Sequence, residues 1–294
     1  MKKEPTLLFC VGATKAGTSW LYDYLAAHDG CHIRTIKELH YFDTIETGMF
    51  KRQLRRRTQV VASLQDRMVT AGGARMAPLA VKLQDALDWR DVLAEGGENP
   101  QRYMDYLTKG HSGDKLVADI SPSYGMLPAT RLQKMAALAP DTRFVFLMRD
   151  PVARLWSHIR MLAQRATKAL DAVPDACFAL LEQVLDGAQS GMTERGDYAS
   201  TVQRLWAAVE PSKLKVMFME DMLTPQGLAR LCGFLGIGYE GAAFDRPVHV
   251  GPVLAMSPAQ KDRARALLRP QYEFVARHYP DIPANWRKNM GEGL

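Results

Sequence analysis

The amino-acid sequence predicts an α/β protein with an open parallel sheet flanked by helices. Apolar runs of strand length recur along the chain, and segments with apolar side chains at helical spacing follow them. The apolar runs have no polar face, which is typical of parallel strands that helices cover on both sides. Because strands and helices alternate, we expect a single open sheet.

The elements of this fold follow in chain order. The first strand is expected at residues 7–11, followed by a turn rich in small residues and a helix from about Trp20 to Gly30. Residues 37–43 are expected to form a loop or short turn. The clearest buried strand ends at Arg149, and Asp150-Pro151 then opens a helix. Further strands are expected at residues 31–36, 116–119 and 213–219, and further helices within residues 48–93, 226–235 and 257–278.

We expect the chain to form one domain, residues 1–294, because no internal repeat or low-complexity linker divides it. A largely helical insert is expected at about residues 48–107, broken at Gly72-Gly73 and Gly96-Gly97. The C-terminal aromatic residues, including Tyr272, Phe274 and Trp286, are expected in the core.

Length and composition indicate an ordinary globular protein. The chain has 294 residues, of which 47% are hydrophobic and 24% charged, which excludes collagen-like, disordered and disulfide-scaffold classes. Four scattered cysteines without a CxxC pair predict reduced thiols. The first apolar run is too short for a signal peptide or a membrane span, so we expect a cytoplasmic protein. Gly30 separates His28 from Cys31 and His32, so no metal site is expected there.

The net charge of +6 fits an anionic ligand, although it is also a common solubility charge. The densest cationic segment is residues 51–57, KRQLRRR. A solvated helix face is favoured for it, and the alternative is a surface that attracts an acidic acceptor or nucleic acid. Aromatic residues for base stacking are missing there, so no nucleic-acid partner is expected.

The turn after the first strand has the properties of an anion site. Unpaired backbone amides and the positive end of a helix dipole converge at such a helix N-terminus. Lys15 adds a point charge, Gly17 permits close backbone approach, and Thr18 and Ser19 add hydroxyl donors. The pattern GxxKxGTS departs from the Walker A pattern GxxxxGK[ST], which counts against an ATPase or GTPase. Asp119 and Asp150 are the nearest candidates for a metal-ligating Asp after a strand.

Two motifs together resemble those of sulfotransferases that use 3′-phosphoadenosine 5′-phosphosulfate (PAPS). Residues 14–21, TKAGTSWL, resemble the 5′-phosphosulfate loop of that family. Residues 149–158, RDPVARLWSH, resemble its 3′-phosphate motif, in which a Ser follows a strand-ending Arg by eight residues. The resemblance implies a P-loop-type sulfotransferase fold and the following donor-binding residues: Lys15, Ala16, Gly17, Thr18, Ser19, Arg149 and Ser157.

Further segments are similar to the heparan-sulfate-type and related bacterial branch of the family. Residues 37–43, KELHYFD, resemble its KExHFFD segment. Residues 121–124, SPSY, resemble its SPSY-like loop. Residues 195–198, RGDY, followed by LW at residues 205–206, resemble its RGxY…LxxW stretch. The chain departs from that branch at Ile120, where a Lys is usual. It also has the sequence HVGP at residues 249–252 in place of a Lys-Gly-Arg loop.

The resemblance implies in-line, metal-independent transfer of a sulfuryl group from PAPS to a hydroxyl or amine of a small-molecule or carbohydrate acceptor. Lys15 would stabilise charge on the leaving oxygen. Glu38 is implied as the base, and His40 is the chemical alternative because imidazole titrates near neutral pH. Asp43 would orient His40 or cap a turn. The helical insert lies outside the nucleotide motifs, so we expect it to govern acceptor choice.

Two other functions stay open at this point. A P-loop kinase or NTPase would require Mg²⁺ and prefer ATP. A non-catalytic module on the same fold would bind PAPS without turnover. The sequence carries no indication of the oligomeric state.

Overall fold

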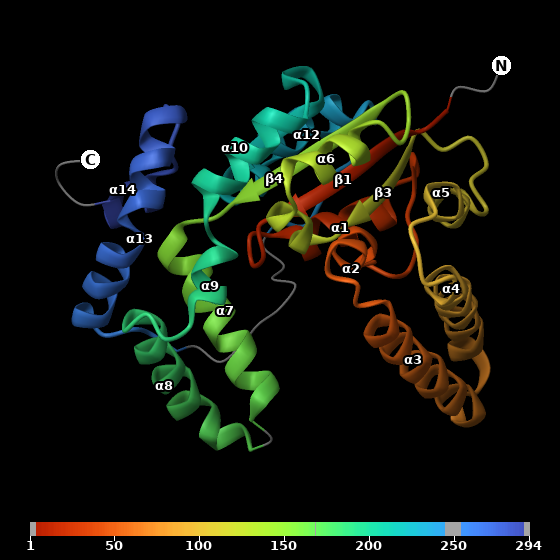
Figure 1. Cartoon of the computed structure of the whole chain (residues 1–294), viewed down its shortest axis with the longest axis horizontal. Helices are drawn as coiled ribbons and strands as arrows, with labels where there is room; N and C mark the ends of the chain where they lie inside the picture. The colour runs from red at the N-terminus through yellow and green to blue at the C-terminus, as the bar shows by residue number, and fades with distance from the viewer. Residues whose placement is uncertain (1–3, 168, 245–253, 291–294) are drawn as a thin grey trace.

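The computed structural model describes residues 4–167, 169–244 and 254–290. At its centre lies a five-stranded parallel sheet with the strand order β2-β3-β1-β4-β5, flanked by helices (Figure 1). This confirms the predicted fold class. The strands are β1 (Thr6–Gly12), β2 (Cys31–His32), β3 (Leu116–Ile120), β4 (Thr142–Met148) and β5 (Leu214–Phe218).

The strands form because their side chains are apolar on both faces. Every residue of β1 and β3 is buried, as the unbroken apolar runs predict. β1 pairs with β3 on one side and β4 on the other, so the carboxyl ends of these three strands meet at one edge of the sheet. The segments that follow the three strands therefore come together there.

The second strand is much shorter than predicted. β2 has only two residues, whereas residues 31–36 were expected to form a strand. The segment beyond His32 is held by side chains instead of a strand ladder. The Thr35 N–H donates to Asp85 Oδ2 at 2.6 Å, the Arg34 guanidinium donates to Asp85 Oδ1 at 2.9 Å, and the Tyr22 hydroxyl donates to the Arg34 carbonyl. Such long-range partners leave no periodic signal in the sequence.

The prediction of a loop at residues 37–43 is wrong for its last three residues. Helix α2 (Tyr41–Thr47) begins inside that segment, without a side-chain cap at its N-terminus. Tyr41 and Phe42 are buried, and the Tyr41 N–H donates to the Tyr124 hydroxyl at 2.9 Å. Tertiary burial of two aromatic rings, rather than a capping signal, therefore starts this helix.

The larger helices start where the sequence signals them. Asp150 accepts a hydrogen bond from the Ala153 N–H at the start of α7, and Ser257 forms a capping box with Gln260 at the start of α13. The remaining bounds are α1 (Thr18–Ala27), α3 (Phe50–Thr70), α4 (Met76–Ala94), α5 (Pro100–Thr108), α6 (Ala129–Ala136), α7 (Pro151–Ala166), α8 (Val173–Leu185), α9 (Ser190–Glu194), α10 (Tyr198–Ala208), α11 (Met219–Met222), α12 (Pro225–Leu235), α13 (Pro258–His278) and α14 (Ala284–Met290).

Helices α3 and α4 form a hairpin that leans away from the sheet (Figure 1). They are joined through a short 3₁₀ turn, Gly73–Arg75, which begins at the second glycine of the Gly72-Gly73 pair, where a break was expected. The hairpin has a small hydrophobic cluster of its own, made of Val61, Leu64, Leu79 and Ala86. The main core contains the sheet and the aromatic residues Tyr272, Phe274 and Trp286, which are buried as predicted.

The described cysteines, Cys10, Cys31, Cys177 and Cys232, are all free thiols. Across the residues that the structure describes, no helix has the combination of length and hydropathy needed to cross a bilayer. The sequence segment at residues 249–252, which departs from the Lys-Gly-Arg pattern, lies outside the described residues.

Candidate functional site

The turn between β1 and α1 presents free backbone amides. Gly17 is the N-cap of α1 with φ +89°, and neither a side-chain cap nor an acidic residue occupies the first turn. The N–H groups of residues 17–19 have no hydrogen-bond partner in the described part of the chain, whereas the Ala16 N–H donates to the Ala13 carbonyl at 3.1 Å. A helix N-terminus in this state attracts anions.

Gly17 is required here for two reasons. Its positive φ is strained for residues with a Cβ, and an added Cβ would lie 2.9 Å from Met219 Cγ and 3.1 Å from Met222 Cε. Helix α11 therefore packs directly under the turn. This close contact fixes the position of the α1 N-terminus relative to the sheet.

Several cations surround the turn. Burial lowers the pKa of the Lys15 ammonium, and the charges of Arg149, Arg165, Lys37 and Arg160 lower it further. Cations gathered around a half-buried ammonium in this way create a site where a multiply charged anion is stabilised. The four partners come from α7, from the end of β4 and from the segment before α2, so only the folded chain assembles this charge.

Arg149 and Lys15 meet although they are far apart in the sequence. Arg149 directly follows β4, and its Nη1 donates to the Lys15 carbonyl oxygen at 3.3 Å. Its backbone is fixed by the buried Tyr198, whose hydroxyl donates to the Arg149 carbonyl at 2.6 Å. Ser157 lies about two turns into α7, is half-buried, and has no hydrogen-bond partner for its hydroxyl among the described residues. The turn after β1 and the segment from Arg149 into α7, which carry the two motifs, thus lie next to each other at the edge of the sheet.

The environment of α7 is more cationic than the sequence motifs alone indicate. Arg154 is fully buried, donates from Nη2 to the Met192 carbonyl, and lies against the backbone of Gly196. Burial, together with the charges of Arg154 and Arg195, lowers the pKa of His158 to about 3. The RGDY segment was the only sequence signal for this group, and it did not indicate that Arg195 would lie near α7.

A second cluster forms around Glu38. Lys37 Nζ lies 3.0 Å from Glu38 Oε1, and His40 Nε2 lies 3.4 Å from Glu38 Oε2. His40 Nδ1 lies 2.8 Å from Asp43 Oδ2 and 3.1 Å from Ser123 Oγ. The Glu38 side chain is 41% exposed, about twice as much as those of Lys37 and His40. The carboxylate is therefore the member of this cluster most accessible to an approaching molecule.

The cluster has defined protonation states at neutral pH. Burial would raise the pKa of Glu38, but hydrogen bonds and charge from His40 and Lys37 outweigh it and lower this pKa to about 2. Burial would lower the pKa of His40, but the carboxylates of Asp43 and Glu38 outweigh it and raise this pKa to about 9. Glu38 is thus an ionised carboxylate at neutral pH, whereas His40 is a cation without a lone pair to accept a proton.

Asp119, at the end of β3, holds the Glu38 segment in place. Its carboxylate accepts hydrogen bonds from Ser121 Oγ at 2.6 Å and from the hydroxyls of Tyr103 and Tyr124 at 2.8 Å. Ser121 Oγ in turn accepts from the Leu39 N–H at 3.0 Å, just as the Tyr124 hydroxyl accepts from α2. Burial raises the pKa of Asp119 to about 6, against the lowering effect of these donors.

The two candidate metal ligands, Asp119 and Asp150, both use their carboxylates to accept hydrogen bonds inside the protein. The Asp119 carboxylate is fully used inside the core, and Asp150 caps α7 and accepts from the Tyr272 hydroxyl at 2.8 Å. Within the described ranges, no group of three or more His, Cys, Asp or Glu side chains is arranged to hold a metal ion.

Lys37 joins the two clusters, a link that the sequence reasoning missed. Its ammonium donates to Ser19 Oγ at 2.9 Å and lies 3.4 Å from Thr18 Oγ1, in addition to its contact with Glu38. One side chain thus touches both the hydroxyls of the turn and the carboxylate. The only sequence signal was the position of Lys37 beside Glu38, which suggested an effect on the pKa and no contact with the turn.

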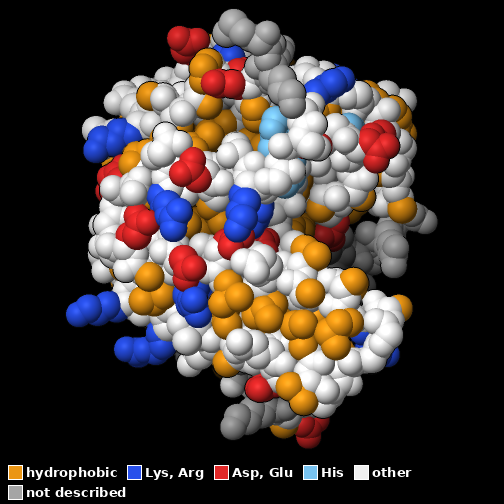
Figure 2. Space-filling view, turned by 90° about the vertical axis from the view of Figure 1, so that its right-hand side faces the viewer, with side chains coloured by type: hydrophobic (Ala, Val, Ile, Leu, Met, Phe, Trp, Pro, Cys, Tyr) orange, Lys and Arg blue, Asp and Glu red, His pale blue; other side chains and the backbone are white. Residues whose placement is uncertain are grey.

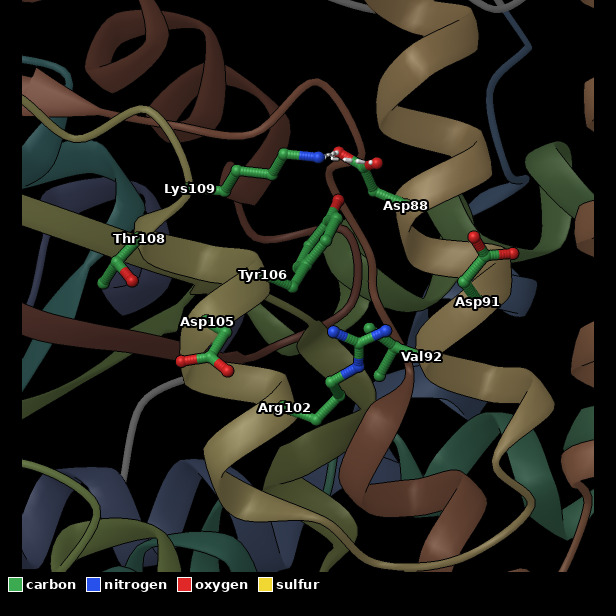
Figure 3. Close-up of a pocket in the computed structure, with 8 residues that line it drawn as sticks. All are labelled: Asp88, Asp91, Val92, Arg102, Asp105, Tyr106, Thr108 and Lys109. Carbon is green, nitrogen blue, oxygen red and sulfur yellow. Dashed lines mark hydrogen bonds and ion pairs between the residues drawn. The ribbon is translucent and has the colours of Figure 1, made fainter.

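A separate cavity of about 510 Å³ lies between α4 and α5, away from these clusters (Figure 3). Lys109 Nζ contacts both oxygens of Asp88 at 2.9 Å there, and Tyr106 lies between them and Arg102. Nearby, hydrophobic side chains gather on the lower part of the face seen in Figure 2. The exposed large hydrophobic residues of the α3–α4 hairpin are Val60, Val69, Met76 and Val81.

The family model described as "Sulfotransferase family" matches residues 5–241. Among the solved structures that share the fold are three from other sulfotransferases. They are a sulfotransferase from Alicyclobacillus acidocaldarius (19% identity, 97% of this chain and 99% of that one, TM-score 0.61), the sulfotransferase domain of the Synechococcus PCC 7002 olefin synthase (16%, 96% and 97%, 0.54) and that of the curacin biosynthetic pathway (21%, 81% and 76%, 0.50). The sequence has no significant match among curated proteins.

Proposed function

The chain belongs to the sulfotransferase family, and on this premise we propose that it transfers a sulfuryl group from PAPS to a hydroxyl or amine of a small-molecule or carbohydrate acceptor. The observation that carries the proposal is the short distance between the donor turn and a free carboxylate. Lys37 Nζ lies 2.9 Å from Ser19 Oγ and 3.0 Å from Glu38 Oε1. In-line transfer needs the donor and the acceptor's base within such reach of each other.

The donor-binding part of the proposal is supported by charge and by free amides. PAPS carries phosphate groups at both ends of its ribose and a sulfuryl group beyond the 5′-phosphate. The amides of residues 17–19 and Lys15 would hold the 5′-phosphosulfate, and Arg149 with Ser157 would hold the 3′-phosphate through a forked contact and a hydroxyl. The cations around Lys15 fit this multiply charged ligand.

The transfer itself would proceed as a displacement at sulfur. The acceptor oxygen forms a bond to sulfur on one side, while the bond from sulfur to the 5′-phosphate oxygen breaks on the other. The electron pair stays on that phosphate oxygen, where Lys15 and the loop amides stabilise the charge. Glu38 accepts the proton of the acceptor hydroxyl. Its ionisation at neutral pH favours it over His40, which would instead orient the carboxylate.

Acceptor choice would depend on the α3–α5 segment. Six residues of α3 are Lys or Arg and one is Asp, and Lys51, Arg52, Arg55 and Arg56 are exposed without an ion-pair partner in the described chain. This surface would favour an acceptor that carries negative charge. Exchanging the segment for that of a relative should change acceptor choice, and an unchanged preference would refute this assignment.

Resemblance to the heparan-sulfate-type branch rests on the sequence segments around Glu38, SPSY and RGDY. The contact of Glu38 with His40 and Lys37 supports a shared arrangement of the base. A kinase or NTPase is disfavoured because Asp119 and Asp150 are occupied inside the protein.

The proposal is tested by calorimetry with adenosine 3′,5′-bisphosphate, the desulfated product, without added metal. AMP and Mg-ATP are the comparison ligands. We expect binding that requires the 3′-phosphate and falls by about 10- to 100-fold in Arg149→Ala, in keeping with loss of a charged forked contact. Arg230→Ala, an exposed arginine on α12, is the matched control.

Two results would contradict the proposal. A preference for Mg-ATP over the bisphosphate would favour the kinase alternative. Binding of PAPS with no sulfuryl transfer to any member of a broad panel of hydroxyl and amine acceptors would indicate a non-catalytic module.

A further inference from the structure

Lys37 is placed differently from an ordinary surface lysine. Its side chain is only 22% exposed, and its ammonium has three partners: Ser19 Oγ at 2.9 Å, Glu38 Oε1 at 3.0 Å and Thr18 Oγ1 at 3.4 Å. An ammonium has three N–H donors, so these contacts use all of them. Two of the three partners belong to the turn that would bind the donor, and the third is the proposed base.

We propose that Lys37 is a second catalytic lysine, whose ammonium binds the sulfuryl oxygens of the donor while it stays beside Glu38. This inference rests on the proposed function. Lys15 and Lys37 would then have different roles. Lys15 stabilises charge on the leaving phosphate oxygen, and Lys37 binds the sulfuryl group that is transferred.

The argument begins with what donor binding does to the hydroxyls of Thr18 and Ser19. In the structure these hydroxyls accept from Lys37. With a phosphosulfate at the α1 N-terminus, they would turn their own O–H groups toward its oxygens. The anion is then the strongest acceptor near the Lys37 ammonium, and a small rotation of a flexible side chain exchanges one partner for the other.

The second step concerns the charge on Glu38. A carboxylate beside a multiply charged donor is repelled by it, so the two can share one site only if a cation lies between them. Lys37 has the required position, since it contacts both sides. Any shift of the ammonium toward the sulfuryl oxygens also weakens its hold on Glu38 and makes this carboxylate a better proton acceptor when the donor is present.

The test compares two ligands that differ only in the sulfuryl group. Calorimetry measures the dissociation constants of PAPS and of adenosine 3′,5′-bisphosphate for the wild type and for Lys37→Met, which keeps the length of the side chain and loses its charge. We expect Lys37→Met to weaken PAPS binding by about 10-fold and to leave bisphosphate binding within about threefold. Lys261→Met, on the exposed face of α13, is the matched control.

A second measurement uses turnover with any acceptor the enzyme accepts. We expect kcat to fall about 100-fold or more in Lys37→Met, as for loss of a transition-state charge donor, and to recover in part in Lys37→Arg. The acid limb of the pH profile should also move to higher pH, because Glu38 loses a neighbouring cation.

The outcomes separate this inference from the proposed function. Equal weakening of PAPS and bisphosphate binding would make Lys37 a structural support of the turn and overturn the inference. Unchanged affinity of Lys37→Met for both ligands would overturn it as well. If the wild type binds neither ligand, the proposed function itself fails.

Discussion

At the residue scale, Glu38 and His40, two neighbouring side chains of opposite charge, set each other's protonation state. Glu38 is ionised because His40 and Lys37 surround it, and His40 is protonated because Asp43 and Glu38 surround it. A carboxylate held this firmly is a weak base in the free enzyme. The strength of Glu38 as a base therefore increases when its cationic partners contact other ligands instead of its carboxylate.

Replacing Glu38 by Gln should lower kcat by about 10²- to 10⁴-fold, the range for loss of a general base. The amide keeps the size of the side chain and cannot take up the acceptor proton, so affinity for adenosine 3′,5′-bisphosphate should stay within about twofold. Steady-state kinetics and calorimetry measure the two quantities. Glu210→Gln, an exposed carboxylate without an ion pair, is the control. Unchanged turnover in Glu38→Gln would exclude it as the base.

The charge of His40 should appear in the pH dependence of stability. Its pKa in the folded protein, about 9, exceeds the ordinary value of 6.5, so protonation stabilises the folded state. This contribution is complete below pH 6.5 and is lost as the pH rises to about 9. The difference in Tm between the wild type and His40→Gln should therefore shrink across this window. A constant difference would show that the His40 cation contributes nothing to stability.

At the element scale, the N-terminus of α1 depends on backbone conformation more than on side chains. Gly17 adopts φ +89° and packs on Met219 of α11. By contrast, Gly233 lies inside α12 with nothing near the position of an added Cβ. The two glycines therefore form a matched pair.

We expect Gly17→Ala to lower the free energy of unfolding by about 1–2 kcal/mol, because the left-handed conformation is strained for alanine. It should also weaken bisphosphate binding about 10-fold, since the amides of the turn move. Gly233→Ala should raise the free energy of unfolding by about 0.5–1 kcal/mol through helix propensity. Chemical denaturation and calorimetry measure both effects. Equal behaviour of the two variants would contradict the assigned geometry.

At the scale of the whole molecule, the parallel sheet brings separate segments to one edge. The strand order places β1 between β3 and β4, so the turn after β1, where we propose that the donor binds, lies between the segments that carry Asp119 and Arg149. The outer part of the α3–α4 hairpin stands apart from this arrangement, with its own cluster of four buried residues, whereas Trp89, Val92 and Leu93 near the end of α4 belong to the main core. Its stability therefore depends on few apolar contacts.

Hydrogen exchange should distinguish these two parts. We expect the amides of α3 and α4 around the hairpin cluster, between Val61 and Ala86, to exchange much faster than those of β1 and β4, because this small cluster opens without unfolding the sheet. Adding adenosine 3′,5′-bisphosphate should slow exchange at the start of α1 and leave the middle of the hairpin unchanged. Exchange in α3 as slow as in β1 would contradict this view of the hairpin.

Much of the fold could be predicted because its signals are local. The runs of β1, β3 and β4 are apolar on both faces, and the caps Asp150 and Ser257 lie within a few residues of the amides they bind. The short β2 and the start of α2 escaped prediction because Asp85 and Tyr124, their hydrogen-bond partners, lie 50 and 83 residues away. Local sequence propensity does not reveal hydrogen-bond partners that are this far away along the chain.

The same division applies to the site. By itself, the sequence determined which residues make up the turn after β1 and the KELHYFD segment, because each is a contiguous motif whose chemical groups are those of its own backbone and side chains. Only the tertiary structure decided that Lys37 touches Ser19, that Arg149 touches the Lys15 carbonyl, and that Asp119 anchors the Glu38 segment. The physical reason is that charge and hydrogen bonding act over a few ångströms, and strand order alone determines which distant segments come that close.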